Sequence, residues 1–245
     1  MKRVMLGVCL AALLTVMVGV VAASAAEPAF FECAKVMGGK FKGPCQVEGP
    51  KGNHELQEGT GKGKPVKGKG TTLSPFAPAI NGGKLECTKT TLTGSLANAT
   101  TFKGLRIVEK GCFGGTSRFC TSAGQPPHTV VSNLLEGTLG YINAAEHRVG
   151  LDLRGEGGAD LFNYNCEGLT EDVGGSAIGE ITPVNALTNA YTVTFTRDGE
   201  GFQSIKSFEG GPEDVPLMKL NGSGPFAASL EGTLNLKMEK LELKG

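Results

Sequence analysis

Cysteine is the residue type in this chain with the most evident chemistry. Seven cysteines occur, and one of them, Cys9, lies in an apolar N-terminal segment. The other six form an even set spread over a glycine-rich remainder. An even set behind an export signal is typical of a disulfide framework that forms in an oxidising compartment. The cysteines expected to form disulfides are Cys33, Cys45, Cys87, Cys112, Cys120 and Cys166.

Sequence alone leaves many connectivities open for six cysteines. Two pairs are favoured because one spans the arms of an expected hairpin and the other brackets a glycine-rich turn. The remaining pair would close the longest loop, so we expect its loss to harm folding most. The predicted pairs are Cys33–Cys45, Cys112–Cys120 and Cys87–Cys166. Metal ligation is not expected, because the chain has no C-x-x-C motif and no histidine close to a cysteine in sequence. No cofactor is predicted.

Carboxylates are the second candidate group. Asp152, Glu156 and Asp160 surround a glycine-rich stretch. Paired carboxylates catalyse glycoside hydrolysis, and acidic loops also hold calcium, although this spacing does not fit a calcium loop. The favoured interpretation is a solvated turn. A second acidic group receives the same interpretation: Glu167, Glu171 and Asp172.

The three histidines, His54, His128 and His147, lie in no recognisable catalytic motif. The chain also lacks a G-x-S-x-G nucleophile elbow. We therefore expect the histidines to lie in surface loops, and we assign no catalytic residue. An enzyme is not the favoured interpretation.

The N-terminus has the features of an export signal. Lys2 and Arg3 precede an apolar run over residues 4–23, which ends in small residues. This pattern predicts a secretory signal peptide over residues 1–25, so that the protein would be secreted or held in the cell envelope. An uncleaved anchor is the alternative, because the run approaches the roughly 20 residues of a membrane span. After cleavage no membrane span is expected.

Composition limits the fold and the partners. The 38 glycines and 12 prolines argue against long helices. The 24 basic and 24 acidic residues balance, and two of the basic ones, Lys2 and Arg3, belong to the predicted signal. A nearly neutral chain has no overall field to attract nucleic acid, so nucleic acid is not an expected partner. The chain has no Trp and three Tyr, which weakens recognition of sugars by aromatic platforms.

Short strands and turn signals predict a single all-β domain over residues 26–245, an antiparallel sandwich or rolled barrel stapled by three disulfides. Residues 191–196 alternate between apolar residues and threonines, as in a strand with one face in the core. Residues 30–36 are expected to form a hairpin with residues 41–47. An L-x-G-x-L pattern over residues 92–96, 135–139 and 230–234 predicts strands that cross a bend. A bulge near Glu239 and Lys240 would keep the last strand in register.

Residues 59–70 are rich in glycine and lysine, with Lys62, Lys64, Lys67 and Lys69. This composition predicts a flexible loop because it offers little apolar area to bury. A basic patch for acidic polymers is the less favoured interpretation, since no aromatic residue is interleaved for stacking.

Several motifs occur in a fixed order along the chain. They are F-E-C at 31–33, L-E-C-T at 85–88, L-E-G-T-L-G at 135–140, V-G-L-D-L at 149–153 and F-E-G-G-P at 208–212. In these motifs the chain resembles a group of uncharacterised secreted, cysteine-paired, β-rich proteins of soil actinobacteria. The resemblance implies export and the cysteine pattern, and it implies no activity.

Together these observations favour a non-enzymatic secreted or envelope-associated β module that binds a macromolecule or a small ligand. The alternative is an extracellular hydrolase that uses acidic residues near Asp152.

Overall fold

The structure is a computed structural model that describes residues 27–59, 63–80, 84–115 and 118–245. The predicted signal peptide over residues 1–25, and Lys62 of the lysine-rich segment, lie outside the described residues. Besides strands, the structure has two 3₁₀ turns, η1 (Pro78–Ile80) and η2 (Glu156–Gly158). Over the part of the chain that the structure describes, no helix has the length and apolar content needed to span a membrane.

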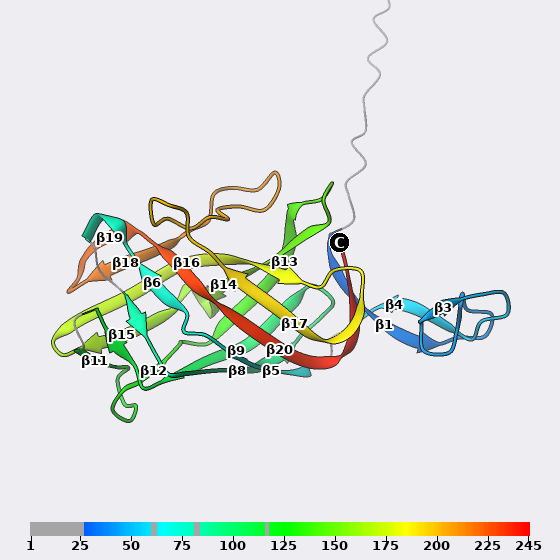
Figure 1. Cartoon of the computed structure of the whole chain (residues 1–245), viewed down its shortest axis with the longest axis horizontal. Helices are drawn as coiled ribbons and strands as arrows, with labels where there is room; N and C mark the ends of the chain where they lie inside the picture. The colour runs from blue at the N-terminus through cyan, green and yellow to red at the C-terminus, as the bar shows by residue number, and fades with distance from the viewer. Residues whose placement is uncertain (1–26, 60–62, 81–83, 116–117) are drawn as a thin grey trace, which may run out of the picture.

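Eight antiparallel strands close into a barrel, which confirms the all-β prediction in its rolled-barrel form (Figure 1). Each strand pairs with the next one of the set along the chain, and the last pairs with the first. The barrel is therefore an up-and-down meander. Its strands are β5 (Lys64–Gly70), β8 (Lys89–Leu96), β9 (Thr101–Lys110), β13 (Leu135–Asn143), β14 (Arg148–Gly155), β16 (Leu169–Thr182), β17 (Leu187–Phe195) and β20 (Ser229–Lys244).

Side chains that alternate inward along each strand fill the barrel, as expected for eight strands. In β17 the residues Tyr191, Val193 and Phe195 are buried, which confirms the strand predicted over residues 191–196. The register between β17 and β20 shifts between Lys237 and Leu241. The bulge predicted near Glu239 and Lys240 is thereby confirmed, and it keeps the flanking leucines of β20 in the core.

Two of the three glycines in the repeated L-x-G-x-L pattern lie where strands shift register. Shifts occur beside Gly94, between β8 and β9, and beside Gly137, between β9 and β13. A Cβ on Gly94 would lie 2.6 Å from Leu105 Cδ2, and one on Gly137 would lie 2.9 Å from Leu151 Cδ1. The predicted irregularities are confirmed at these two places, and close approach of a neighbouring side chain explains the glycine.

The two ends of the barrel differ in their connections. Because antiparallel strands alternate in direction, every second connection lies at the same end. At one end the turns are short: residues 97–100, 144–147 and 183–186. At the other end every connection carries further elements. These are β6 (Ser74–Phe76), β7 (Leu85–Glu86), β10 (Phe113–Gly114), β11 (Arg118–Thr121), β12 (Thr129–Val131), β15 (Phe162–Cys166), β18 (Pro216–Leu220) and β19 (Ser223–Ala227).

Most of these added strands form a small second sheet, in the order β7, β10, β11, β15, β16, β18, β19. Strand β16 belongs to both sheets. Its residues up to Gly175 pair with β18, and from Ser176 onward it pairs with β14 of the barrel. Gly175, with a φ of 74°, lies at this change of partner.

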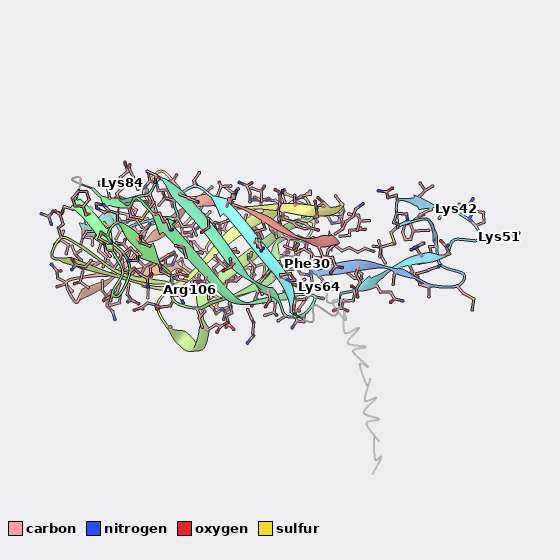
Figure 2. The ribbon with its side chains drawn as sticks, turned by 90° about the horizontal axis from the view of Figure 1, so that it is seen from below. Phe30, Lys42, Lys51, Lys64, Lys84 and Arg106 are labelled. Atoms are coloured by element: carbon pink, nitrogen blue, oxygen red, sulfur yellow. A yellow bond between two sulfur atoms is a disulfide. The ribbon has the colours of Figure 1, made fainter. Side chains whose placement is uncertain are left out.

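An N-terminal arm extends from the short-turn end (Figures 1 and 2). It consists of β1 (Ala29–Lys35), β2 (Phe41–Lys42), β3 (Val47–Glu48) and β4 (His54–Glu58). Strand β1 pairs with β20 at Ala29–Phe31 and then with β4, so the predicted hairpin with residues 41–47 is wrong. Phe30 is buried in the barrel end and contacts Phe102 and Tyr191 edge-on.

The disulfide prediction holds for one pair and fails for two. Cys33–Cys45 is present and closes the arm, whereas the predicted Cys112–Cys120 and Cys87–Cys166 pairs are wrong. The observed pairs are Cys87–Cys112 and Cys120–Cys166.

Strand register explains the correction. Cys87, Cys112, Cys120 and Cys166 lie opposite one another in one row across β7, β10, β11 and β15. Cys120 N donates to Cys112 O, so this middle pair is hydrogen-bonded and wide. The two outer pairs have Cα atoms 4.1 Å apart. The disulfides therefore form across the two narrow pairs, and no disulfide joins Cys112 and Cys120, which form the wider, hydrogen-bonded pair in the middle.

The flexible loop predicted over residues 59–70 is also wrong for residues 64–70, which form the barrel strand β5. Val66 is buried, and Gly68 lies between strands because Leu92 and Leu236 occupy the space where a larger side chain would point. A neighbouring strand therefore supplies the apolar area that the local sequence lacks.

Candidate functional site

The lysines of β5 point out of the barrel. Lys67 and Lys69 alternate with the inward Val66 and Gly68, and both lysines are exposed. A spacing of two residues places their side chains on the same face of the sheet.

Neighbouring strands add further cations to this face. Lys237 of β20 lies directly opposite Lys67, and Thr93 of β8 lies on its other side, followed by Arg106 of β9. Lys89 and Lys110 lie opposite each other on β8 and β9. We call this surface the basic face: Lys67, Lys69, Lys89, Arg106, Lys110 and Lys237. Figure 2 labels Arg106 on the barrel wall.

The charges of the basic face are only partly balanced by neighbouring acids. Glu239 of β20 lines the same groove as Lys67 and Lys237, but its carboxylate contacts Lys64. None of its six cations makes an ion pair with another described residue. Strands β5, β8 and β9 contain one acidic residue, Glu109, and it points into the barrel. By contrast, Lys64 at the end of β5 contacts Glu32 and Glu239. Like charges directly opposite each other destabilise a sheet, so an anion bound here would relieve repulsion.

A groove of about 890 Å³ runs over β5, β20 and β17 at one side of the basic face. Its lining includes Lys67, Lys69 and Lys237. Asn235 also lines it, and its Oδ1 accepts a hydrogen bond from Thr192 Oγ1 at 3.1 Å, so the Asn235 amide group can point its N–H donors elsewhere. Cations beside amide and hydroxyl groups suit a ligand with negatively charged oxygens.

The carboxylates near Asp152 have separate partners. Asp152 is buried, against the expected solvated turn, and its Oδ2 accepts from Arg154 at 2.6 Å. Burial raises the pKa of Asp152, and Arg154 opposes the shift. Glu156 accepts from Gly104 N, and Asp160 accepts from an asparagine side chain. No hydrogen bond joins any two of these carboxylates within the described ranges.

The second acidic group is a solvated turn only in part. Glu171 is buried and accepts from Tyr164 OH at 2.8 Å, and burial raises its pKa. Asp172 accepts from Asn163 at 2.7 Å. Glu167 is exposed and has a φ of 48°. Glu171 and Asp172 therefore satisfy donors in the second sheet, whereas Glu167 lies in an exposed turn as expected.

The histidines have structural contacts. His54 begins β4 rather than lying in a loop, and its Nδ1 contacts Asn53 Oδ1. His128 packs against the exposed ring of Phe119, with ring centroids 4.0 Å apart. His147 Nδ1 lies 2.7 Å from Gly245 O. No two of these histidines share a contact in the part of the chain that the structure describes.

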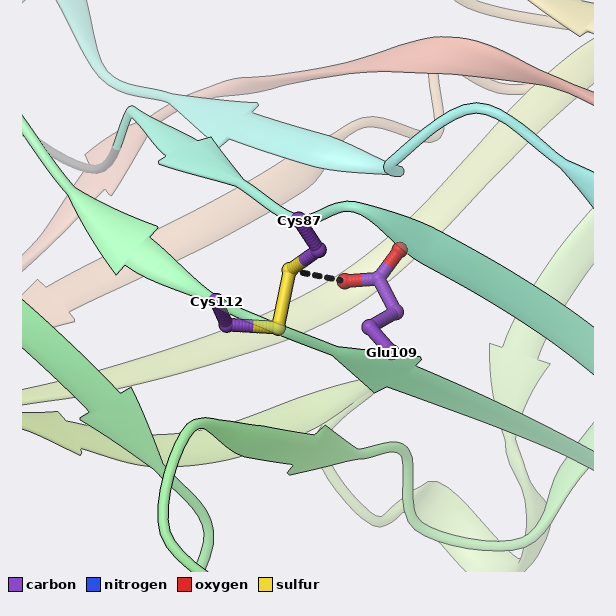
Figure 3. Close-up of side chains that lie close together, drawn as sticks. All are labelled: Cys87, Glu109 and Cys112. Carbon is purple, nitrogen blue, oxygen red and sulfur yellow. Dashed lines mark hydrogen bonds between the residues drawn. A yellow bond between two sulfur atoms is a disulfide. The ribbon is translucent and has the colours of Figure 1, made fainter.

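A buried carboxyl lies beside one disulfide (Figure 3). Glu109 of β9 is fully buried, and its Oε2 lies 3.7 Å from Cys87 Sγ. Its Oε1 accepts from Leu73 N at 2.7 Å and from Thr90 Oγ1 at 3.3 Å. Burial raises its pKa to about 7, although the hydrogen bond from Leu73 N opposes the shift. Cys87, Glu109 and Cys112 are close enough to share a metal ion, but the two sulfurs are bonded to each other.

Sequence reasoning identified Lys67 and Lys69 but missed Lys237, Arg106 and Glu109. Lys237 could not be assigned because it meets β5 where the barrel closes, and Arg106 could not be assigned because its position depends on the register of β5, β8 and β9. Glu109 had a local signal: it follows Leu105 and Ile107 at the inward positions of an alternating strand. A carboxyl at such a position is unusual, because charged groups are rarely buried without a partner.

Comparison with protein-family models, with curated proteins and with solved structures gives no match.

Proposed function

We propose that this protein is an exported, non-enzymatic binding module whose basic face holds an acidic polysaccharide of the cell envelope or its surroundings. The observation that carries the proposal is the Lys67–Lys237 pair: two exposed lysines directly opposite each other, without an acid to separate them. Lys89 and Lys110 repeat the arrangement two strands away.

The shape of the face favours a chain-like ligand. The cations are spread over four neighbouring barrel strands, which lie about 4.8 Å apart, so they match charges repeated along a polymer better than one small anion. The groove beside them adds amide and hydroxyl groups for uncharged ring oxygens. An acidic polysaccharide offers both kinds of group.

Nucleic acid fits less well. The basic face has no aromatic residue for base stacking, which is the usual support for single strands. The chain as a whole has 24 basic and 24 acidic residues, so the attraction is local.

Export supports the same assignment. Three disulfides are typical of proteins that fold in an oxidising compartment, and the N-terminal sequence has the pattern of a signal peptide. Envelope and extracellular polysaccharides are the acidic polymers that such a protein would meet.

The test uses polygalacturonate, a carboxylated polysaccharide, with neutral dextran as the control ligand. Titration calorimetry at low salt should detect polygalacturonate binding that weakens as salt rises. A variant with Lys67→Gln, Lys69→Gln and Lys237→Gln should lose about 10- to 100-fold in affinity, because each exposed ion pair contributes up to about 1 kcal/mol.

The matched control changes three exposed lysines of the N-terminal arm, Lys40→Gln, Lys42→Gln and Lys51→Gln. Figure 2 shows Lys42 and Lys51 far from the barrel wall. This control should bind like the wild type. Equal losses in both variants, no binding at low salt, or tighter binding to single-stranded DNA would overturn the proposal. Release of new reducing ends that Asp152→Asn abolishes would instead support the hydrolase.

A further inference from the structure

Two disulfides lie in the same row of the second sheet but differ in their surroundings. Cys120 and Cys166 are both buried, and Gly114 packs against their sulfurs. Cys87 is only partly buried, whereas its partner Cys112 is fully buried. An external thiol can therefore approach Cys87 more easily than the other three sulfurs of the row.

The Glu109 carboxyl faces this more accessible disulfide. Its Oε1 receives two donors, Leu73 N and Thr90 Oγ1. In the neutral acid the proton therefore belongs on Oε2, which lies 3.7 Å from Cys87 Sγ. A carboxyl oxygen of Glu109 also lies within 4.8 Å of Cys112 Sγ. The hydrogen-bond pattern thus leaves Oε2 for the acidic proton, and Figure 3 shows a carboxyl oxygen of Glu109 facing the sulfur of Cys87.

We propose that Cys87–Cys112 is a site of thiol–disulfide exchange with an external dithiol, and that the Glu109 carboxyl supplies the proton that the departing sulfur needs. A thiolate of the dithiol attacks Cys87 Sγ and forms a mixed disulfide. The Cys87–Cys112 bond breaks, its electron pair goes to Cys112 Sγ, and that sulfur takes the proton from Glu109 Oε2.

The second half restores the carboxyl. The second thiol of the dithiol gives its proton to the Glu109 carboxylate and attacks its own sulfur in the mixed disulfide. Cys87 Sγ leaves with the electron pair and takes a proton from Glu109, which then regains one from solvent. The dithiol is oxidised by two electrons to a disulfide, and Cys87–Cys112 is reduced to two thiols.

Few other charges act on Glu109. The elements packed against it contribute the Thr90 hydroxyl from β8, the Leu73 amide, the cysteine pair, and Tyr164 from β15, whose hydroxyl donates to Glu171. Tyr164 stays neutral because burial and the nearby carboxylates raise its pKa. The pKa of Glu171 is also raised by burial, so a pH step near neutrality reports Glu109 when Glu109→Gln abolishes it.

The test treats the folded wild-type protein with dithiothreitol at about pH 6 and about pH 8, on either side of the Glu109 pKa of about 7. Free thiols are alkylated at intervals and located by mass spectrometry. Cys87 and Cys112 should become labelled before Cys120 and Cys166. The rate constant, divided by the thiolate concentration of the reductant, should fall about tenfold between the two pH values, because general acid catalysis is lost.

Two variants separate proton supply from structure. Glu109→Gln keeps a side-chain oxygen for Leu73 N but has no acidic proton, so its normalised rate should not depend on pH. Thr90→Val removes one hydrogen bond to Glu109 but leaves the acid, so it should keep the pH step. Near-UV circular dichroism checks that each variant is folded.

The proposal is overturned if Cys120–Cys166 is reduced first or at the same rate, or if the wild-type normalised rate is equal at the two pH values. A pH step that persists in Glu109→Gln would also overturn the role of the carboxyl. If a variant does not fold, the order of labelling and the wild-type pH step can still overturn the proposal. The proposal is independent of polysaccharide binding, which involves the outer wall of the barrel.

Discussion

Lys67 on β5 lies directly opposite Lys237 on β20, at the seam where the last strand of the barrel closes onto the first. Both side chains point to solvent. Residues directly opposite on antiparallel strands have Cβ atoms about 5 Å apart, so two positive charges here repel each other. The closing seam of the barrel therefore carries an electrostatic cost that an opposite charge would remove.

Reversing one of these charges should make the fold more stable and polysaccharide binding weaker. We expect Lys237→Glu to raise the free energy of unfolding by about 0.2–1 kcal/mol, because it turns a repulsive pair into an attractive one. The same variant should bind polygalacturonate more weakly than the wild type. Urea unfolding and calorimetry measure the two effects.

The control for this prediction is Lys42→Glu on the arm, which should leave both properties nearly unchanged. A Lys237→Glu protein that is less stable than the wild type would show that the two lysines do not repel each other appreciably.

Stability should depend on pH through Glu109. In the unfolded chain this carboxyl ionises at its ordinary pKa near 4.5, whereas in the fold it keeps its proton up to about 7. The stabilisation of the fold by the neutral Glu109 carboxyl is fully present below the pKa of the unfolded chain. It declines as pH rises above that pKa and is lost once pH passes about 7. The change is on the order of 3 kcal/mol.

Glu109→Gln removes this titration, so the variant should gain stability relative to the wild type at about pH 8 and much less at about pH 5. Urea unfolding of both proteins at the two pH values measures the difference. A gain that is the same at both would mean that Glu109 ionises in the fold as it does in the unfolded chain.

The Cys120–Cys166 disulfide should be the most important for stability. It closes the longest of the three loops, with a sequence separation of 46 between its cysteines against 25 and 12 for the others. Replacing both of its cysteines with serine should cost about 4 kcal/mol. Thermal unfolding should show the largest drop for this pair and the smallest for Cys33–Cys45, and the reverse order would contradict the loop-closure argument.

The seam between β5 and β20 leaves no room for a side chain at Gly70. A Cβ at this position would overlap Thr233 O, which belongs to the rigid backbone of β20. We expect Gly70→Ala to destabilise the barrel by about 1–3 kcal/mol, measured by urea unfolding. Gly199→Ala is the control, since nothing lies within 4 Å of a Cβ there. Equal stability of the two variants would mean that the seam can open at little cost.

Much of the barrel was predictable because its strands carry their own pattern. The alternation of Tyr191, Val193 and Phe195 indicates β17 without any neighbour, and the change of parity after Met238 indicates the bulge in β20. Strand β5 was not predictable in this way. Two of its inward positions are Gly68 and Gly70, because side chains or backbone from neighbouring strands fill the space, and this is information the local sequence does not contain.

The same limit applies to the cysteines and to the basic face. Cys112 and Cys120 lie opposite each other as the turn predicts. Which neighbouring cysteines come close enough for a disulfide, however, depends on the hydrogen bonds between the strands. Lys67 could be identified as part of a basic segment, whereas its partner Lys237 is 170 residues away in sequence and meets it because the barrel closes.

The unequal ends of the barrel have a consequence for how such a protein can change over time. Four insertions share one end, and each returns to the strand beside the one it left. Segments there can lengthen, shorten or be exchanged without altering the register of the eight strands. Lys67, Arg106 and Lys237 lie on the barrel wall, whereas Lys89 and Lys110 lie where the wall meets the inserted strands. Segments at the elaborated end can therefore change while the groove lined by Lys67 and Lys237 is retained. The fold is thus suited to serve as a display scaffold in which one end of the barrel can vary.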